Sequence, residues 1–179
     1  METLVHALFG SVERAPEAVA VVHRGRRVSY GALWRDVCRV SGFLRREGLQ
    51  QEARVGLLVE NSPEYIAAYY GVLAAGGAVV ALNAADKSRN HIATLRHAGA
   101  DWLFADGPHG ELPAIRAAFG GALGLVTFGD VADATSTGET PGATSYDALP
   151  ALGAEALGIA ALLGGGRLAA MIYTSGTTG

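Results

Sequence analysis

Cysteine is almost absent from this sequence, and its scarcity excludes a disulfide-stabilised fold. One cysteine, Cys38, occurs among the 179 residues, so no internal disulfide can form. Because Cys38 falls inside a helical pattern, we expect a small buried apolar side chain there rather than a nucleophile. The first residues also lack the basic segment and apolar core of a secretory signal. These features fit a reducing compartment, and we expect a cytoplasmic protein.

An excess of basic residues is also missing. Lys and Arg together number 14 and Asp and Glu 17, which gives a formal net charge of −3. Nucleic-acid-binding surfaces need a basic patch, so we expect no nucleic acid partner. The histidines form no H-E-x-x-H motif or Cys/His pair, so we expect surface or packing roles for them rather than metal ligation. They are His6, His23, His91, His97 and His109.

One stretch, residues 66–85, carries no charged residue and is long enough to cross a bilayer. Glycines and Asn83 interrupt it, however, and alanine, its commonest residue, is only weakly hydrophobic. A buried helix that runs into a buried strand explains this composition better. We therefore expect no integral membrane segment.

What is present is a regular alternation of helical and strand patterns. A hydrophobic content of 50% and a charged content of 17% are typical of a folded domain. Apolar spacing predicts helices at 3–14, 30–48, 63–75, 88–98, 111–119 and 155–163, a hairpin at 18–23 and 26–30, and strands at 54–60, 78–82, 102–105, 123–128 and 168–173. Alternation of this kind predicts an α/β fold, with a largely parallel sheet covered by helices on both faces.

Two segments interrupt this alternation. Residues 129–144 are dense in Gly, Thr, Ser and Asp and predict an exposed, flexible loop within the domain. Gly164-Gly165-Gly166 lacks the strand before it and the helix after it that a dinucleotide-binding fingerprint requires, so it predicts a turn.

The last residues of the sequence carry its strongest chemical signal. An apolar strand pattern passes directly into hydroxyl residues and glycines, and glycine lets backbone N–H groups converge on an anion. The hydroxyl groups add donors for phosphate oxygens. We therefore expect an ATP phosphate-binding loop formed by Thr174, Ser175, Gly176, Thr177, Thr178 and Gly179.

This loop lacks the G-x-x-x-x-G-K-[ST] spacing of a Walker-type loop. It resembles instead the signature Tyr-Thr-Ser-Gly-(Thr/Ser)-Thr-Gly of the adenylate-forming superfamily, which includes acyl- and aryl-CoA synthetases and the adenylation domains of peptide synthetases. Residues 173–179 match the signature, and 28–33 and 73–83 resemble the motifs Leu-(Thr/Ser)-Tyr-x-Glu-Leu and Leu-x-Ala-Gly-(Gly/Ala). The sequence departs from the family at Ala32, where Glu is usual, and at Ala81 and Ala84, where prolines are common.

The resemblance implies a fold, a reaction and its co-substrates. It identifies residues 1–179 as an N-terminal part of the large domain of an adenylate-forming enzyme. Such an enzyme converts a carboxylic acid and ATP into an acyl-adenylate, with Mg²⁺ as cofactor, and then transfers the acyl group to a thiol such as that of CoA. The family's lysines, Mg²⁺ ligand and ribose-binding Asp have no counterpart here, so we name no catalytic residue. We expect the remainder of the same polypeptide to supply them, and the isolated chain to be inactive.

Three functions remain open at this stage. Thr177 and Leu82-Asn83 favour an acyl- or aryl-CoA synthetase, as in fatty acid metabolism. The first alternative is an adenylation domain that loads a carrier protein, and the second is a non-catalytic nucleotide-binding or interaction domain. Tyr65, Tyr69 and Tyr70 on one predicted helix fit core packing or the wall of an acyl pocket. Arg24, Arg26 and Arg27 fit a solvated hairpin tip or a contact with anionic CoA or a carrier protein.

Overall fold

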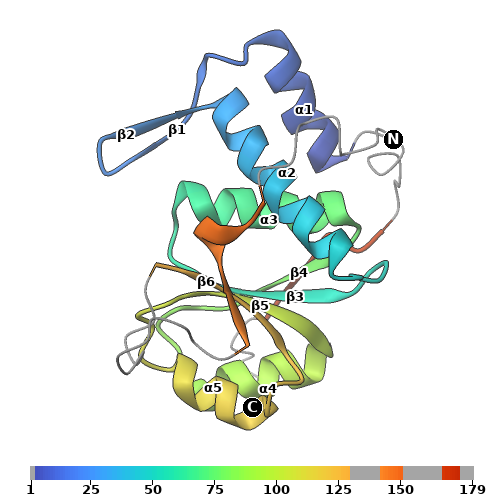
Figure 1. Ribbon diagram of the computed structural model, residues 1–179, viewed down its shortest axis with the longest axis vertical. Helices are drawn as coiled ribbons and strands as arrows, with labels where there is room; N and C mark the ends of the chain where they lie inside the picture. Colours follow the sequence, from blue (N-terminus) through green and yellow to red (C-terminus); the bar gives the residue numbers. More distant parts are fainter. Residues whose placement is uncertain (1–2, 130–141, 151–166, 174–179) are drawn as a thin grey trace, which may run out of the picture.

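The computed structural model describes residues 3–129, 142–150 and 167–173. Within them, a parallel sheet of six strands has the order β7-β6-β5-β3-β4-β8, and β1 and β2 form a separate antiparallel hairpin (Figure 1). The strands are β1 (Val19–His23), β2 (Arg26–Ser29), β3 (Arg54–Leu58), β4 (Ala78–Ala81), β5 (Ala100–Asp106), β6 (Gly124–Phe128), β7 (Ala143–Ser145) and β8 (Ala170–Ile172). The helices are α1 (Leu4–Arg14), α2 (Tyr30–Arg46), α3 (Pro63–Ala75), α4 (Ser88–Ala98), α5 (Leu112–Phe119) and the short 3-10 helix η1 (Tyr146–Ala148).

Local signals determine where the helices begin and end. At the start of α3, the Ser62 hydroxyl accepts a hydrogen bond from the Tyr65 backbone N–H at 3.0 Å, and Pro63 occupies the first turn, where its missing N–H costs nothing. The helix ends at Gly76, whose φ of 93° is accessible without strain only to glycine. Ser29 caps α2 in the same way, by accepting a hydrogen bond from the Ala32 N–H at 3.2 Å. These boundaries confirm the predicted ones.

The order of the strands decides which face each helix covers. The chain passes from β3 through α3 to β4 on one side, and then crosses back through α4 and α5 to β5 and β6 on the other side of β3. Crossover connections between parallel strands are right-handed. A connection that runs along the sheet in one direction therefore places its helix on one face, and a connection that runs in the other direction places its helix on the opposite face. Figure 1 shows α2 and α3 on one face and α4 and α5 on the other. The predicted parallel sheet with two covered faces is thus confirmed.

The core consists of apolar clusters on the two faces of the sheet and beyond α2. The first packs α2 and α3 against the sheet and includes Leu44, Val55 and Phe104. The second joins α1, the hairpin, α2 and α3 around Trp34. The third packs α4 and α5 under the opposite face and includes Leu95, Leu103 and Ile115.

Cys38 belongs to the second cluster and is buried, as its helical pattern predicts. Burial raises the pKa of the Cys38 thiol to about 11. The thiolate is therefore scarce at neutral pH, which agrees with a packing role.

Several predicted segments differ from those in the structure. β3 ends at Leu58 rather than at Glu60, and β5 extends beyond the predicted 102–105 at both ends. In the predicted loop 129–144, Ala143 and Thr144 belong to β7, which pairs with β6. This strand is too short to show a period-two pattern, so the prediction missed it. Residues 130–141, the predicted helix 155–163 and the predicted turn at 164–166 lie outside the described residues.

The uncharged stretch 66–85 is divided between α3, the turn at Gly76 and β4. Among the described residues, no helix combines the length and the apolar character that a membrane crossing requires.

Candidate active site at the carboxyl edge of the sheet

Two crevices open at the carboxyl edge of the sheet, one on each side of β3. The chain leaves β3 toward α3 on one face, whereas it leaves both neighbouring strands, β4 and β5, toward the opposite face. Loops that diverge in this way leave space between them, and ligands of parallel α/β proteins bind in such space. An open cleft of about 960 Å³ lies on the β5 side and one of about 430 Å³ on the β4 side. Glu60 and Asn61, in the turn after β3, line both.

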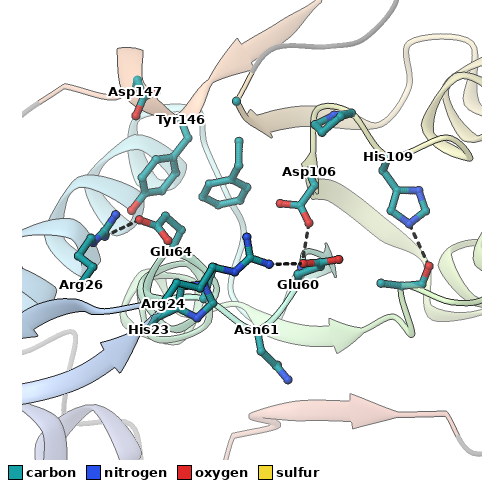
Figure 2. A pocket seen from close by; sticks show the side chains of 15 residues that line it. His23, Arg24, Arg26, Glu60, Asn61, Glu64, Asp106, His109, Tyr146 and Asp147 are labelled. Carbon is teal, nitrogen blue, oxygen red and sulfur yellow. Dashed lines mark hydrogen bonds and ion pairs between the residues drawn. The ribbon is translucent and has the colours of Figure 1, made fainter.

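The tip of the β1–β2 hairpin forms one wall of the larger cleft (Figure 2). Arg24 contacts Glu60 at 3.4 Å, and Arg26 contacts Glu64, in the first turn of α3, at 2.6 Å. Both arginines are exposed, which fits the predicted solvated tip, but their charges are matched by carboxylates rather than directed at open solvent. An exposed pair such as Arg24–Glu60 contributes little to stability, about 0–1 kcal/mol.

Asp106 connects the turn after β3 with the end of β5. Its carboxylate accepts a hydrogen bond from the Glu60 backbone N–H at 2.8 Å (Figure 2). Burial raises the pKa of Asp106, although the hydrogen bond from Glu60 works in the opposite direction. The carboxylate thereby holds the two strand ends that border the larger cleft.

An aromatic pair closes the β6 side of the larger cleft. The rings of Phe128 and Tyr146 lie 4.3 Å apart between centroids, and the Tyr146 side chain is 5% exposed. Its hydroxyl has no hydrogen-bond partner among the described residues, and burial raises the pKa of Tyr146. Sequence reasoning missed this residue. The available signal was that Tyr146 is the one aromatic residue between Phe128 and Tyr173.

Two histidines hold the chain that follows β4. His91 on α4 binds the Asn83 carbonyl oxygen through Nε2 at 2.9 Å, and His109 binds the next carbonyl, that of Ala84, through Nε2 at 3.1 Å. The His109 Nδ1 accepts a hydrogen bond from the Glu111 N–H, so its Nε2 carries the proton. His91 is buried, with the ring of His109 edge-on at 5.9 Å.

These contacts give both histidines a packing role, which is one of the two roles, surface or packing, that were predicted. Among the described residues, no group of three or more His, Cys, Asp or Glu side chains could hold a metal ion.

The smaller cleft lies between the ends of β3 and β4 and is lined in part by Tyr65. Tyr65 also packs against the first apolar cluster, and its ring lies 6.3 Å from that of Tyr69. Burial raises the pKa of both phenols. Tyr65 thus has the core-packing role that was one of the two predicted, and it also borders a cleft. Its role in the wall of an acyl pocket stays a prediction.

The six residues of the predicted phosphate loop, 174–179, lie outside the described residues. The strand before them is described: β8 pairs in parallel with β4, with Ala81 beside Ile172. Tyr173, which follows β8, therefore lies at the same edge of the sheet at which β4 ends. A contact that the sequence did not indicate occurs here, because the Tyr173 hydroxyl lies 2.7 Å from Nδ1 of His97, near the end of α4.

Comparison with solved structures supports the fold. A benzoate CoA ligase from Burkholderia xenovorans LB400 superposes with a TM-score of 0.68 and 21% identity, over 83% of this chain and 28% of that one. The peptide synthetase FmoA3 superposes with a TM-score of 0.59 and 28% identity, over 82% of this chain and 13% of that one.

Curated relatives of two kinds match the sequence. A long-chain-fatty-acid–CoA ligase of Bacillus subtilis (strain 168) is 35% identical over 82 residues, which is 46% of this chain and 15% of that protein. Malpinin synthetase of Mortierella alpina is 32% identical over 179 residues, which is 98% of this chain and 2% of that protein. The chain therefore spans only a small part of the length of the relatives it matches.

The family model described as "AMP-binding enzyme" matches residues 8–179, nearly the whole chain. This match includes all six strands of the parallel sheet and helices α2 to α5. The chain therefore belongs to the AMP-binding, adenylate-forming enzyme family, and it corresponds to an N-terminal part of that family's fold.

Proposed function

We propose that this protein activates a carboxylic acid with ATP and then transfers the acyl group to the thiol of CoA. The observation that carries the proposal is the family match over residues 8–179, which includes the Tyr-Thr-Ser-Gly-Thr-Thr-Gly motif after β8. In the first step a carboxylate oxygen attacks the α-phosphorus of ATP and pyrophosphate leaves. In the second step the thiol sulfur attacks the acyl carbon and AMP leaves.

In this proposal the phosphate loop consists of Thr174, Ser175, Gly176, Thr177, Thr178 and Gly179. Their hydroxyl and backbone N–H groups would donate hydrogen bonds to the β- and γ-phosphates as negative charge develops on the departing pyrophosphate. The parallel pairing of β8 with β4 supports this role, since it directs the chain into the loop at the edge of the sheet where ligands bind.

Mg²⁺ would neutralise part of the polyphosphate charge when it is bound. The described residues contain no cluster of three potential ligands, so we assign no Mg²⁺ ligand within them. We propose that the Mg²⁺ ligands, the catalytic lysines and the carboxylic acid pocket belong to other parts of the polypeptide. The short span of this chain on its relatives supports that view.

CoA is proposed as the acceptor because of two features of the sequence. Thr177 and the pair Leu82-Asn83 resemble CoA synthetases more than peptide synthetase domains. The alternative, transfer to a carrier protein, is supported by relatives such as gramicidin S synthase 2 of Brevibacillus brevis, which is 39% identical over 80 residues.

The test is carboxylate-dependent exchange of pyrophosphate into ATP by the complete gene product, measured over a panel of carboxylic acids. Thr177→Val is expected to slow the exchange by about 10-fold or more, because a hydrogen bond to a charged group contributes roughly 1.5–3 kcal/mol. Thr144→Val is the matched control, since β7 lies at the opposite end of the sheet from β8.

Incubation of the adenylate with CoA or with a phosphopantetheine-bearing carrier protein then identifies the acceptor. ATP binding without exchange for any acid would contradict the enzyme proposal and favour a nucleotide-binding domain.

A further inference from the structure

The larger cleft is bordered by a buried hydroxyl group that no described residue satisfies. Tyr146 is 5% exposed, and its hydroxyl makes no hydrogen bond within the described part of the chain. A buried polar group without a partner destabilises a fold, and such groups are rare in native structures. A phenylalanine could make the same ring contact with Phe128, at 4.3 Å between centroids, without this cost. The hydroxyl is therefore a candidate contact for a ligand of the cleft.

The ring that carries this hydroxyl is held in place by contacts from two elements. Arg39 on α2 donates hydrogen bonds to the carbonyl oxygens of Tyr146 and Leu149, at 3.0 and 3.1 Å, and lies 5.3 Å from the centre of the ring. Phe128, at the end of β6, packs on the same ring. Figure 2 shows the hydroxyl directed toward the side of the cleft at which Glu64 lies. A binding group must be fixed in this way if it is to select a ligand.

The charges that line the cleft are mostly negative. Four carboxylates and two guanidinium groups line it, and the two arginines are paired with Glu60 and Glu64. No ion pair in the described ranges neutralises the other two carboxylates, which belong to Asp106 and Asp147. Burial raises the pKa of Asp106, because its charge is poorly solvated. A cationic ligand would relieve this cost, whereas an anionic ligand would be repelled.

The ion pair at Glu64 shows a cation that fits this surface. The Arg26 guanidinium contacts the Glu64 carboxylate at 2.6 Å, and the Arg26 side chain is 58% exposed, so a ligand can displace it at little cost. Burial raises the pKa of Tyr146, and the charges of nearby carboxylates, among them Glu64 and Asp147, raise it further. The phenol therefore stays protonated at neutral pH, and its oxygen can accept a hydrogen bond from an N–H group.

We propose that the larger cleft binds a small organic cation, a guanidinium or a protonated amine, beside the Tyr146 hydroxyl. The N–H groups of the ligand bond to the phenol oxygen, and the carboxylates of Glu64, Asp106 and Asp147 match its charge. Charge-assisted hydrogen bonds of this kind are the strong ones, and a guanidinium carries donors only. The proposal does not depend on the proposed reaction with ATP.

The test is the binding of agmatine, which carries a guanidinium and an ammonium group, to the complete gene product. Isothermal titration calorimetry measures the affinity at constant ionic strength, since exposed charges are screened by salt. Glutarate and pentanediol, an anion and a neutral compound of similar length, are the matched probes. Saturable binding is expected for agmatine and not for the other two compounds at the same concentrations.

Tyr146→Phe is expected to weaken the binding of agmatine about 5-fold, as for the loss of one net hydrogen bond. The same variant should keep or raise the urea midpoint, because it removes a buried unpaired hydroxyl. A merely structural role of the hydroxyl would instead lower the midpoint. This pair of measurements therefore separates a binding role from a packing role.

Asp106→Asn is expected to weaken the binding about 10-fold or more, since hydrogen bonds to charged groups contribute more than neutral ones. The asparagine keeps a side-chain oxygen for the Glu60 N–H, so the turn after β3 is retained. Asp101→Asn is the matched control, because Asp101 is an exposed residue at the other end of the same strand. Arg26→Ala is expected to tighten the binding, because it removes the cation that competes for Glu64.

Absence of saturable agmatine binding, or equal binding of glutarate or pentanediol, would overturn the inference. Unchanged affinity in Tyr146→Phe, or a lower urea midpoint in that variant, would contradict the role of the hydroxyl. Weaker binding in Arg26→Ala would show that the cleft does not select cations in this way. None of these outcomes bears on pyrophosphate exchange, so the proposed function is tested separately.

Discussion

At the scale of single residues, Arg39 shows how one side chain joins distant parts of the chain. From α2 its guanidinium donates hydrogen bonds to the carbonyl oxygens of Tyr146, Asp147 and Leu149, at 3.0 to 3.3 Å, across up to 110 positions of sequence. It also pairs with Asp36 at 3.2 Å and lies 5.3 Å from the centre of the Tyr146 ring. Arg39 thereby places Tyr146 against Phe128 at the border of the larger cleft.

Arg39→Ala is expected to lower the free energy of unfolding by about 2 kcal/mol, because several carbonyl groups lose their donor at once. Arg39→Lys should recover little of this loss, since an ammonium group cannot reproduce the planar fork of a guanidinium. Urea denaturation measures both changes. Arg35→Ala, at an exposed position of the same helix, is the control and should change stability by less than about 0.5 kcal/mol.

Glu111 provides a second prediction at this scale, one that depends on pH. Its carboxylate accepts a hydrogen bond from the Ser88 N–H at 2.8 Å and contacts Lys87 at 3.3 Å. The hydrogen bonds from Ser88 lower the pKa of Glu111 from 4.5 to about 2, and Lys87 adds to the effect. Since the folded pKa lies below the unfolded one, ionised Glu111 stabilises the fold above pH 4.5, and this contribution disappears as the pH falls toward 2.

Glu111→Gln should therefore be less stable than the wild type at pH 7, with a difference in urea midpoint that shrinks as the pH falls from about 4.5 to about 2. Glu17→Gln, at an exposed position, controls for the loss of one negative charge. A difference that stayed constant over this range of pH would contradict the assigned pKa.

At the scale of elements, the contact between α2 and α3 depends on a glycine. A Cβ atom at Gly71 would lie 2.5 Å from Cβ and Cγ1 of Val40, closer than real side chains approach. Val40 is buried on α2, so it has little room to move. The helices are therefore in contact because Gly71 has no side chain, and this contact packs both of them onto the sheet.

Gly71→Ala is expected to lower the free energy of unfolding by about 1–2 kcal/mol, since overpacking outweighs the gain in helix propensity. Gly10→Ala in α1 is the matched control, because its nearest neighbour is the flexible end of Arg14. That substitution should be neutral or stabilising by up to about 1 kcal/mol. Combining Gly71→Ala with Val40→Ala should cost less than the sum of the two single changes.

Elements also show which parts of the fold were predictable. Ser62-Pro63 and Gly76 mark the two ends of α3 because capping is chemistry between residues a few positions apart. β7 was missed because three residues of mixed character carry no periodicity, and its pairing with β6 decides its conformation. The pair His97–Tyr173 was equally hidden, since 76 positions separate its members.

At the scale of the whole molecule, the two crevices arise from the reversal of strand order around β3. The predicted phosphate loop follows β8, next to β4 at one end of the sheet, whereas Tyr146 lies at the opposite end, beside β6 and β7. In the proposed function, these 179 residues supply one part of the adenylate-forming site.

We expect the isolated 179-residue chain to show no carboxylate-dependent ATP–pyrophosphate exchange, because the residues that resemble the family's phosphate loop occur here without its catalytic lysines and Mg²⁺ ligand. The complete gene product, assayed in parallel at the same concentration, is the positive control. Exchange by the short chain above a no-protein blank would show this expectation to be wrong.

The amino-acid sequence by itself determined the kinds of elements, most of their ends and the family, because periodicity, caps and a contiguous motif act over neighbouring residues. The tertiary structure decided the order of the strands and the contacts across the clefts. Arg24 forms an ion pair with Glu60, and Asp106 accepts a hydrogen bond from the Glu60 N–H. Both contacts require the hairpin and β5 to pack beside the end of β3. Such contacts depend on how whole elements pack together, and no local pattern in the chain records that packing.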